Sequence, residues 1–308
     1  MPVYAWIAVS LAGILLVLLV DSALGRWIWR DDSVSFELVA EGPGTDTAFI
    51  LPGFINPSAY LGESLGRTLD SFHKVYVAKY SQTDFDWQKI YWAMFNLFDN
   101  FWGGKRIFVF GHSMGGQVGT LLALKATPSE GLKPLPINKL VLDCTPSTGY
   151  SLRAPRAVIT FLRWFLKIYS GGPLGLLVAA GFHWLMNKKS PLPVSKEVDA
   201  KWYHNYAMGM RWYPNRAAIA QFKFMLNFEL PEPLEKGHTP EVLIIANDNP
   251  GADKDPLVCQ FLSIADWTWI FPDAQIVSDP LVKHANPVEQ PKVYADILKP
   301  FLSTAAER

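Results

Sequence analysis

The segment from Gly111 to Gly115, which reads Gly-His-Ser-Met-Gly, constrains the fold of this chain more than any other. It follows the apolar run 106–110 and precedes the helix-like run 117–124. That order predicts a strand, a sharp turn and a helix, with the Ser113 side chain exposed at the turn. The flanking glycines permit the turn because they remove side chains that would collide with the neighbouring strand and helix. A serine hydroxyl becomes a good nucleophile only when it is held beside a base.

Short apolar runs of strand character alternate with helical stretches along the chain. They lie at 35–39, 47–51, 74–79, 106–110, 139–143, 241–246 and 274–278. This alternation predicts an α/β fold, with a mostly parallel sheet and helices on both faces. A length of 308 residues and a hydrophobic content of 50% suffice for one large core with an inserted subdomain.

The strand, Gly-x-Ser-x-Gly turn and helix resemble those of the α/β-hydrolase family, and the resemblance extends from about Val34 to Leu302. The first thirty residues are expected to lie outside it. The resemblance implies a serine hydrolase of the esterase or lipase type, in which the nucleophile, here Ser113, is followed along the chain by an acid and a histidine. It argues against the dehalogenase branch, whose nucleophile is an aspartate. No cofactor is implied.

The loop 51–54 resembles the early strand-to-helix loop of that family, which supplies one backbone amide of the oxyanion hole. The resemblance implies that the N–H groups of Phe54 and Met114 face the developing negative charge of the reaction. An ordinary Pro-Gly turn at this loop is the alternative.

Residues 282–291 resemble the family's histidine loop and make His284 the expected base. An imidazole suits that role because its ordinary pKa of about 6.5 lets it accept and return a proton near neutral pH. The remaining histidines are expected to have packing or surface roles: His73, His112, His183, His204 and His238. None is spaced with a second histidine or a cysteine as a metal site requires, so no metal is expected.

The acid is expected in the loop 247–258. Asp255 fits best, because the sequence Asp-Pro-Leu-Val resembles the family's turn into the following helix. Three alternatives stay open: Asp248 near the end of the preceding strand, Asp253 in the same loop, and Asp143 at the end of the strand 139–143. The true acid holds the tautomer of the catalytic histidine and stabilises its protonated form.

The first part of the chain contains 18 consecutive positions without a charge, from Val3 to Val20. This length predicts a single membrane-spanning helix. A cleaved signal peptide is the rival, but the start lacks a basic segment and no clean Ala-x-Ala follows. Trp27 and Trp29 suit a membrane interface, and Arg26 and Arg30 on the C-terminal side predict that the catalytic domain lies in the cytoplasm.

The segment from Thr145 to His238 is far longer than a typical connection of about 4–6 residues and is predicted to form a helical cap. Within it, apolar residues recur at three- and four-residue steps and predict one helix face: Val158, Phe161, Leu162, Phe165, Ile168 and Tyr169. A second apolar run follows at 174–186, and aromatic and methionine residues crowd 202–213. A site roofed by such side chains favours an apolar acyl or alkyl group, so a hydrophobic carboxylic ester is the expected substrate.

The chain therefore divides into an anchor and interface segment (1–30), two parts of the hydrolase core (31–144 and 239–308) and the cap (145–238). Acidic and basic residues balance at 28 each, which argues against a nucleic-acid partner. Cys144 and Cys259 are too few for a disulfide framework and are expected to be buried thiols. Thioesterase or amidase activity stays open, as does a non-catalytic module that binds a lipid or a protein. The sequence does not indicate an oligomeric state.

Overall fold

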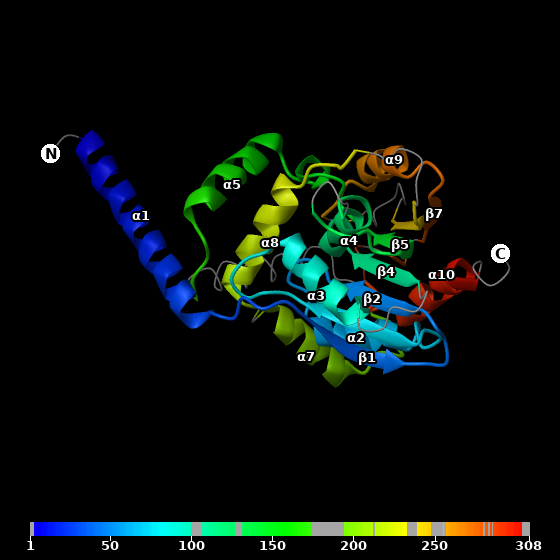
Figure 1. Ribbon diagram of the computed structural model, residues 1–308. Helices are drawn as coiled ribbons and strands as arrows, with labels where there is room; N and C mark the ends of the chain where they lie inside the picture. Colours follow the sequence, from blue (N-terminus) through cyan, green and yellow to red (C-terminus); the bar gives the residue numbers. More distant parts are fainter. Residues whose placement is uncertain are drawn as a thin grey trace.

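The structure is a computed structural model. It describes residues 3–99, 106–126, 131–173, 194–211, 213–232, 239–247, 255, 257–279, 281–282, 284 and 286–303. A seven-stranded sheet forms the centre of the molecule, with helices on both of its faces (Figure 1). The predicted α/β fold with a mostly parallel sheet is confirmed.

The strands in chain order are β1 (Ser35–Glu41), β2 (Thr47–Leu51), β3 (Lys74–Lys79), β4 (Ile107–His112), β5 (Ile137–Asp143), β6 (Glu241–Ala246) and β7 (Gln275–Ser278). Their order across the sheet is β1-β3-β2-β4-β5-β6-β7. Only β1 pairs antiparallel to its neighbour, β3, and the other pairs are parallel. The parallel strands therefore direct their carboxyl ends to the same edge of the sheet. Each run predicted from the sequence overlaps one of the observed strands.

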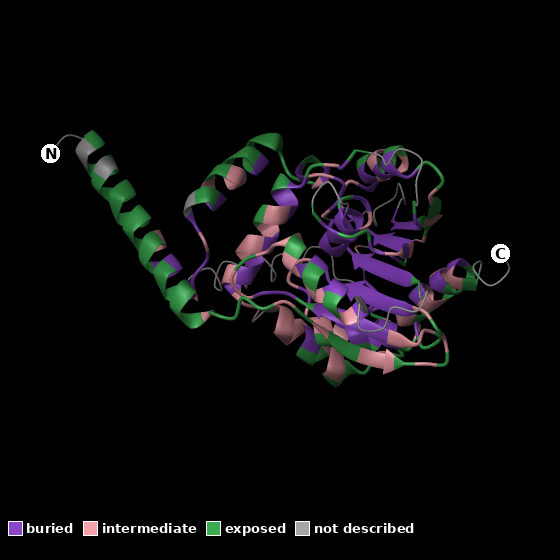
Figure 2. Cartoon of the chain, viewed as in Figure 1, coloured by how far each residue is buried: buried purple, intermediate pink, exposed green. Residues whose placement is uncertain are grey.

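Two layers of helices cover the sheet, because the central strands are apolar on both faces (Figure 2). Along β4, Ile107 and Val109 belong to one core cluster, whereas Phe108 and Phe110 belong to the other. The helices α3 (Trp87–Asp99), α4 (Met114–Leu124) and α9 (Gln260–Ile270) cover the first face, and α2 (Ser58–Gly66) and α10 (Pro291–Ser303) cover the second. Each fully buried valine, leucine, isoleucine or phenylalanine side chain contributes about 1.5–3 kcal/mol to the stability of the fold.

A helical insertion lies between β5 and β6, as predicted. Its described part contains the 3-10 turn η2 (Gly149–Ser151) and the helices α5 (Arg156–Ile168), α7 (Ala200–Arg211) and α8 (Asn215–Asn227). Tyr206 of α7 joins the core cluster of α2 and α10, whereas Met225 of α8 joins that of α3, α4 and α9. The insertion therefore bridges both helical layers. The predicted run 174–186, His183, Trp212 and His238 lie outside the described residues.

Helix α5 packs through only part of the predicted apolar face, which includes Leu162 and Phe165. Ile159 and Leu166 are buried against Leu226 of α8, whereas Val158 and Phe161 are 44% and 57% exposed. The apolar residues cover a wide arc of this helix, so their period alone did not identify which part of the arc packs.

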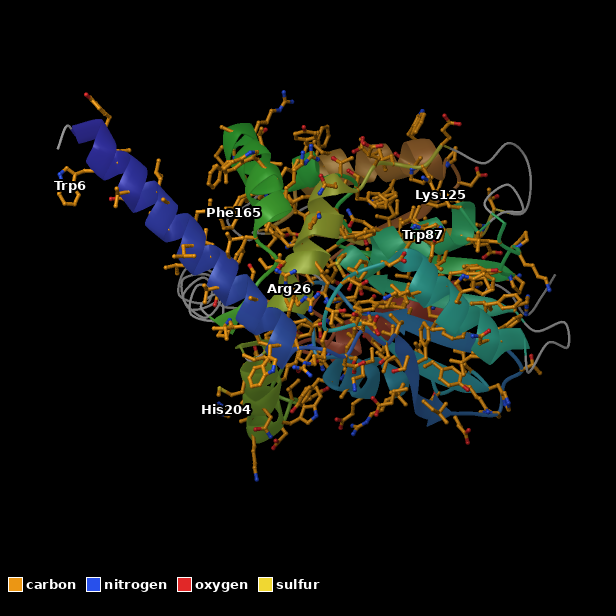
Figure 3. The ribbon with its side chains drawn as sticks, turned by 60° about the vertical axis from the view of Figure 1, so that its left-hand side comes forward. Trp6, Arg26, Trp87, Lys125, Phe165 and His204 are labelled. Carbon is orange, nitrogen blue, oxygen red and sulfur yellow. The ribbon has the colours of Figure 1, made fainter. Side chains whose placement is uncertain are left out.

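Helix α1 (Val3–Ile28) extends away from the body of the protein, with Trp6 near its far end and Arg26 near the body (Figures 1 and 3). Its side chains are mostly exposed and apolar (Figure 2). In the described part of the chain it is the one helix long and apolar enough to cross a membrane, a test that signal sequences also pass. Its C-terminal end is held by the insertion: the Tyr169 hydroxyl donates to Asp21 Oδ2 at 2.7 Å, and Arg216 donates to the Trp29 carbonyl at 3.2 Å.

Candidate active site

Ser113 occupies the turn between β4 and α4 with backbone angles of φ 50° and ψ −118°. A non-glycine residue in such a region costs about 1–3 kcal/mol and persists only where its surroundings enforce it. Here the Ser113 N–H donates to the Asp143 carbonyl at 2.8 Å, and the Gly116 N–H donates to the Ser113 carbonyl at 2.9 Å. A side chain on Gly115 would meet the Leu51 carbonyl oxygen at 2.0 Å, so glycine is required there.

Three sequence-predicted residues meet at this turn. Ser113 Oγ lies 3.2 Å from His284 Nε2, and His284 Nδ1 lies 2.9 Å from Asp255 Oδ2. A proton on Nδ1, donated to the carboxylate, leaves the Nε2 lone pair facing the serine hydroxyl. The arrangement is therefore that of a nucleophile, a base and an orienting acid.

Asp255 is fully buried, and both of its oxygens accept hydrogen bonds. Oδ1 accepts from the backbone N–H groups of Leu257 at 2.8 Å and Val258 at 3.0 Å. Oδ2 accepts from the Gln260 side-chain amide in addition to His284. Because donors fix both oxygens, the carboxylate keeps one orientation toward the imidazole.

The alternative acids have different surroundings or lie outside the described residues. Asp143 Oδ2 lies 3.2 Å from His112 Nδ1, and Asp143 Oδ1 accepts from the Tyr294 hydroxyl at 2.8 Å. Asp248 and Asp253 lie outside the described part of the chain. Asp255 is thus the described candidate acid that is hydrogen-bonded to His284.

A second network of buried hydrogen bonds, which the sequence analysis did not identify, supports the turn at Ser113. The Asn56 amide donates to His112 Nε2 at 2.9 Å, so the His112 proton lies on Nδ1 and is donated to Asp143. Tyr294 Oη also accepts from the backbone N–H of Asn286 at 3.0 Å, two residues beyond His284. The register of β4 and β5, in which His112 pairs with Asp143, brings the two side chains together.

The early loop packs directly against Ser113. A Cβ on Gly53 would lie 2.6 Å from His112 Cδ2 and 3.0 Å from Ser113 Cβ, so the backbone leading into Phe54 passes beside the serine. Met114 is the first residue of α4, and the N–H groups of a first helical turn have no partner within the helix. The two expected oxyanion-hole residues therefore flank Ser113.

Two titratable groups of the histidine loop have shifted pKa values. Burial lowers the pKa of His284, but the facing Asp255 carboxylate and, more weakly, Asp143 outweigh this effect and raise the pKa above its ordinary value of 6.5. Burial raises the pKa of Glu289 to about 7, although its own backbone N–H and the Tyr203 hydroxyl act in the opposite direction. The imidazole that faces Ser113 and a carboxyl group five residues further on thus both have raised pKa values, and that of Glu289 is about 7.

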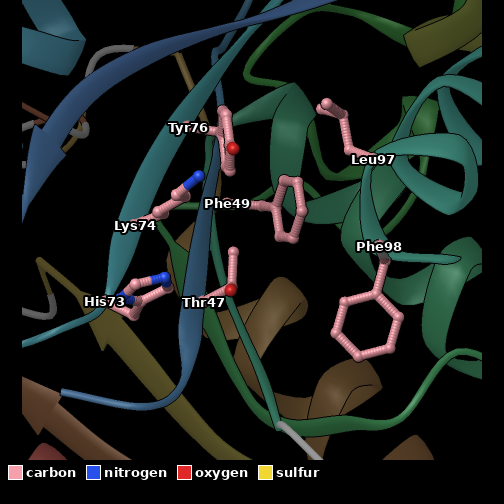
Figure 4. Close-up of a pocket in the computed structure, with 7 residues that line it drawn as sticks. All are labelled: Thr47, Phe49, His73, Lys74, Tyr76, Leu97 and Phe98. Carbon is pink, nitrogen blue, oxygen red and sulfur yellow. The ribbon is translucent and has the colours of Figure 1, made fainter. Parts of the chain in front are cut away.

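A small cavity between β2, β3 and α3 lies away from this site (Figure 4). It holds about 10 Å³ and is lined by Thr47, Phe49, His73, Lys74, Tyr76, Leu97 and Phe98. Thr47 and Lys74 begin their strands, whereas Ser113 follows the end of β4, so the cavity is at the opposite edge of the sheet. In open α/β sheets ligands bind at the carboxyl edge, which is the edge that holds Ser113.

Comparisons with solved structures find the same fold at low sequence identity. The carboxylesterase CesB (YbfK) from Bacillus subtilis is 15% identical with a TM-score of 0.56, and the match covers 94% of this chain and 99% of that one. A carboxylesterase from Nitrososphaera gargenis is 15% identical with a TM-score of 0.56, covering 89% and 96%. MenH from S. aureus is 15% identical with a TM-score of 0.56, covering 88% and 98%. A search of curated proteins found no significant match.

A scan against protein families matches the alpha/beta hydrolase family over residues 6–297. The match begins within α1, so the expectation that the first thirty residues lie outside the family resemblance is wrong from residue 6 onward. The match spans almost the whole chain and agrees with the sheet order, the turn at Ser113 and the helical insertion. The chain belongs to the alpha/beta hydrolase family.

Proposed function

We propose that this chain is a serine hydrolase that cleaves a hydrophobic carboxylic ester, a lipid or a medium-chain acyl ester, through an acyl-enzyme intermediate. The observation that carries the proposal is the pair of contacts at the turn: 3.2 Å from Ser113 Oγ to His284 Nε2, and 2.9 Å from His284 Nδ1 to Asp255 Oδ2. These contacts supply a nucleophile, a base with the correct tautomer and a charged partner for the protonated base.

The reaction proceeds in two halves. His284 Nε2 takes the Ser113 proton as Oγ attacks the ester carbonyl carbon, and the amides of Phe54 and Met114 stabilise the resulting oxyanion. When the intermediate collapses, the bond to the alcohol oxygen breaks and His284 returns the proton to the leaving alcohol. Water, deprotonated by His284, then attacks the acyl-serine and releases the acid while Ser113 regains its proton.

An apolar substrate is supported by the side chains near the early loop. The Phe54 and Phe222 rings lie 5.6 Å apart, and Phe224 of the same helix α8 packs against Phe85 at 4.7 Å. Aromatic side chains beside the early loop favour an acyl or alkyl chain over a charged group. We expect p-nitrophenyl esters of increasing acyl length to give a rising kcat/KM up to medium length. A best kcat/KM on the acetate would count against a lipid substrate.

Covalent labelling tests the enzymatic proposal. A fluorophosphonate probe should label full-length protein in detergent micelles, and Ser113→Ala should abolish the labelling. Ser81→Ala is the matched control, because Ser81 is also buried but its hydroxyl donates to the Asp84 carboxylate. A wild-type protein that stays unlabelled would favour a non-catalytic hydrolase-fold module that binds a lipid or a protein. Thioester and amide substrates in the same assay series distinguish the related acyl hydrolases.

We also propose that α1 is an uncleaved membrane anchor, that the insertion 145–238 caps the site between the core parts 31–144 and 239–308, and that the catalytic domain lies in the cytoplasm. The exposed apolar surface of α1 supports the anchor, and Arg26 and Arg30 near the body support the orientation. Protease added to spheroplasts should leave the domain intact, and digestion should follow only after lysis. Digestion from outside would reverse the orientation.

A further inference from the structure

A buried glutamine of the insertion holds the loop that precedes α2. Gln221 lies in the middle of α8 and is fully buried. Its Oε1 accepts a hydrogen bond from the backbone N–H of Ile55 at 3.0 Å, across 166 residues of sequence. A buried glutamine amide is costly unless its donors and acceptor are used, so this contact specifies where α8 and the loop meet.

The Ile55 N–H determines which end of the Gln221 amide faces the loop, and Tyr213 accepts from the other end. Gln221 Nε2 donates to the Tyr213 hydroxyl at 2.6 Å. A hydroxyl can accept this bond, whereas the backbone N–H of Ile55 can only donate. The amide therefore presents its oxygen to Ile55, because a flipped amide would place its NH₂ group against the Ile55 N–H.

The Ile55 backbone needs this support. Its φ is 50°, in the left-handed region that a β-branched side chain rarely adopts. Such a conformation costs about 1–3 kcal/mol and persists only where neighbouring contacts enforce it. The hydrogen bond from Ile55 to Gln221 fixes the peptide plane that joins Phe54 to Ile55.

Other contacts fix the rest of the loop. The Pro52 carbonyl accepts from the Tyr80 hydroxyl at 3.0 Å, and the Phe54 ring packs against Phe222, the residue that follows Gln221 on α8. Tyr80 belongs to the core side of the loop, whereas Gln221 and Phe222 belong to the insertion. The insertion therefore holds the C-terminal side of Phe54, the residue that offers its amide to the oxyanion.

We propose that Gln221 is a positioning residue for the reaction: by accepting from Ile55 N–H, it holds the Phe54 amide in the orientation that stabilises the oxyanion. The inference rests on the proposed function. It assigns to the insertion a part in transition-state stabilisation, in addition to covering the site. Because the contact acts on the oxyanion and not on bound ester, its loss lowers kcat and leaves KM nearly unchanged.

Two substitutions of Gln221 by residues of similar size distinguish a positioning role of this side chain from a packing role. Gln221→Met fills the space but has no acceptor for Ile55, and kcat is expected to fall by about 10- to 100-fold, since small misplacements of catalytic groups have effects of this size. Gln221→Glu keeps an acceptor oxygen toward Ile55, while the Tyr213 hydroxyl can donate to the other oxygen, and kcat is expected to stay within about threefold of wild type. A packing role predicts the reverse order, because methionine suits a buried site better than a carboxyl group.

The assay measures kcat and KM on p-nitrophenyl hexanoate with full-length protein in detergent, normalised to the sites that a fluorophosphonate titrates. Normalisation removes the effect of misfolded protein, so a loss of stability in either variant does not enter kcat. Affinity for a trifluoromethyl ketone, which forms a tetrahedral adduct with the serine, should fall in Gln221→Met in parallel with kcat/KM.

Asn215 provides a matched control. It is also a buried amide on α8, but it donates to the Gly172 carbonyl at 2.8 Å instead of contacting the early loop. Asn215→Leu is expected to lower stability and to leave kcat per titrated site unchanged. A Gln221→Met variant with wild-type kcat, or a Gln221→Glu variant as slow as Gln221→Met, would overturn the inference while the proposed function stands. A wild type that neither labels nor hydrolyses esters would overturn both.

Discussion

Replacing Asp255 by asparagine is expected to remove most of the turnover and to keep the shape of the site. The substitution changes one oxygen into an NH₂ group. At Oδ2 that group would face two donors, His284 Nδ1–H and the Gln260 amide. At Oδ1 it would face the backbone N–H groups of Leu257 and Val258. Every placement of the new NH₂ group therefore opposes an existing donor.

The least costly solution moves the proton of His284. The asparagine oxygen stays with the two backbone donors, which cannot change their protons. His284 then accepts from the new NH₂ group through Nδ1 and carries its proton on Nε2. This tautomer points a hydrogen at Ser113 Oγ, 3.2 Å away, and cannot remove the serine proton. The equivalent change in serine proteases lowers kcat by about 10⁴, which corresponds to about 5.5 kcal/mol of transition-state stabilisation.

The assay compares asparagine variants at all four candidate aspartates by kcat on a p-nitrophenyl ester, normalised to folded protein. Asp143→Asn is the most informative control, because Asp143 is also fully buried and also faces a histidine, His112. It is expected to destabilise the fold with a far smaller loss of kcat, and Asp248→Asn and Asp253→Asn are expected to have little effect. Equal activity of all four variants would refute the triad.

Three further outcomes are expected. The value of kcat/KM should fall as the pH falls through the pKa of His284, because only neutral imidazole acts as a base. The midpoint should lie above pH 6.5, because Asp255 raises that pKa. A midpoint below 6.5 would contradict this. The pKa of about 7 for Glu289 lies above its ordinary value of 4.5, so its contribution to stability is complete below pH 4.5 and lost as the pH rises through 7. Urea unfolding should show a loss of about 3 kcal/mol over this range that is absent from Glu289→Gln. Gly53→Ala should lower kcat at least about tenfold, because the new Cβ would lie 2.6 Å from His112 Cδ2 and displace the early loop away from Ser113. Unchanged kinetics would show that the loop accommodates the methyl group without moving the oxyanion donor.

Local patterns were sufficient to predict the sheet and the turn. Residues 48–51 and 107–110 are apolar at every position, since they are buried on both faces, and this signal does not depend on distant contacts. Ser113 was predictable from the Gly-x-Ser-x-Gly turn between an apolar run and a helix, although the collision that requires glycine at position 115 involves Leu51 of the distant strand β2. The contact of His284 with the serine, and that of Asp255 with His284, were expected from the family resemblance and not from periodicity.

Contacts between distant segments could not be predicted from local patterns. Gln221 has no neighbour in the sequence that indicates a partner 166 positions earlier, and its role depends on how α8 lies over the loop. The part of α5 that packs could not be predicted for a related reason. Apolar residues cover a wide arc of that helix, and its contact with Leu226 shows which of them are buried. Burial against a particular partner is a tertiary property that a single-sequence period does not contain.

The end of α1 offers a test of whether the apolar helix is a structural part of the folded protein. A side chain on Gly25 would lie 2.1 Å from the Gly171 carbonyl oxygen, whereas a side chain on Gly13 of the same helix would meet nothing within 4 Å. Gly25→Val must therefore separate α1 from the turn that carries the Tyr169 contact to Asp21, and it should lower the free energy of unfolding by about 1–3 kcal/mol. Gly13→Val introduces the same residue into the same helix without a collision and should not. Equal stability of the two variants in detergent micelles would mean that α1 moves independently of the body.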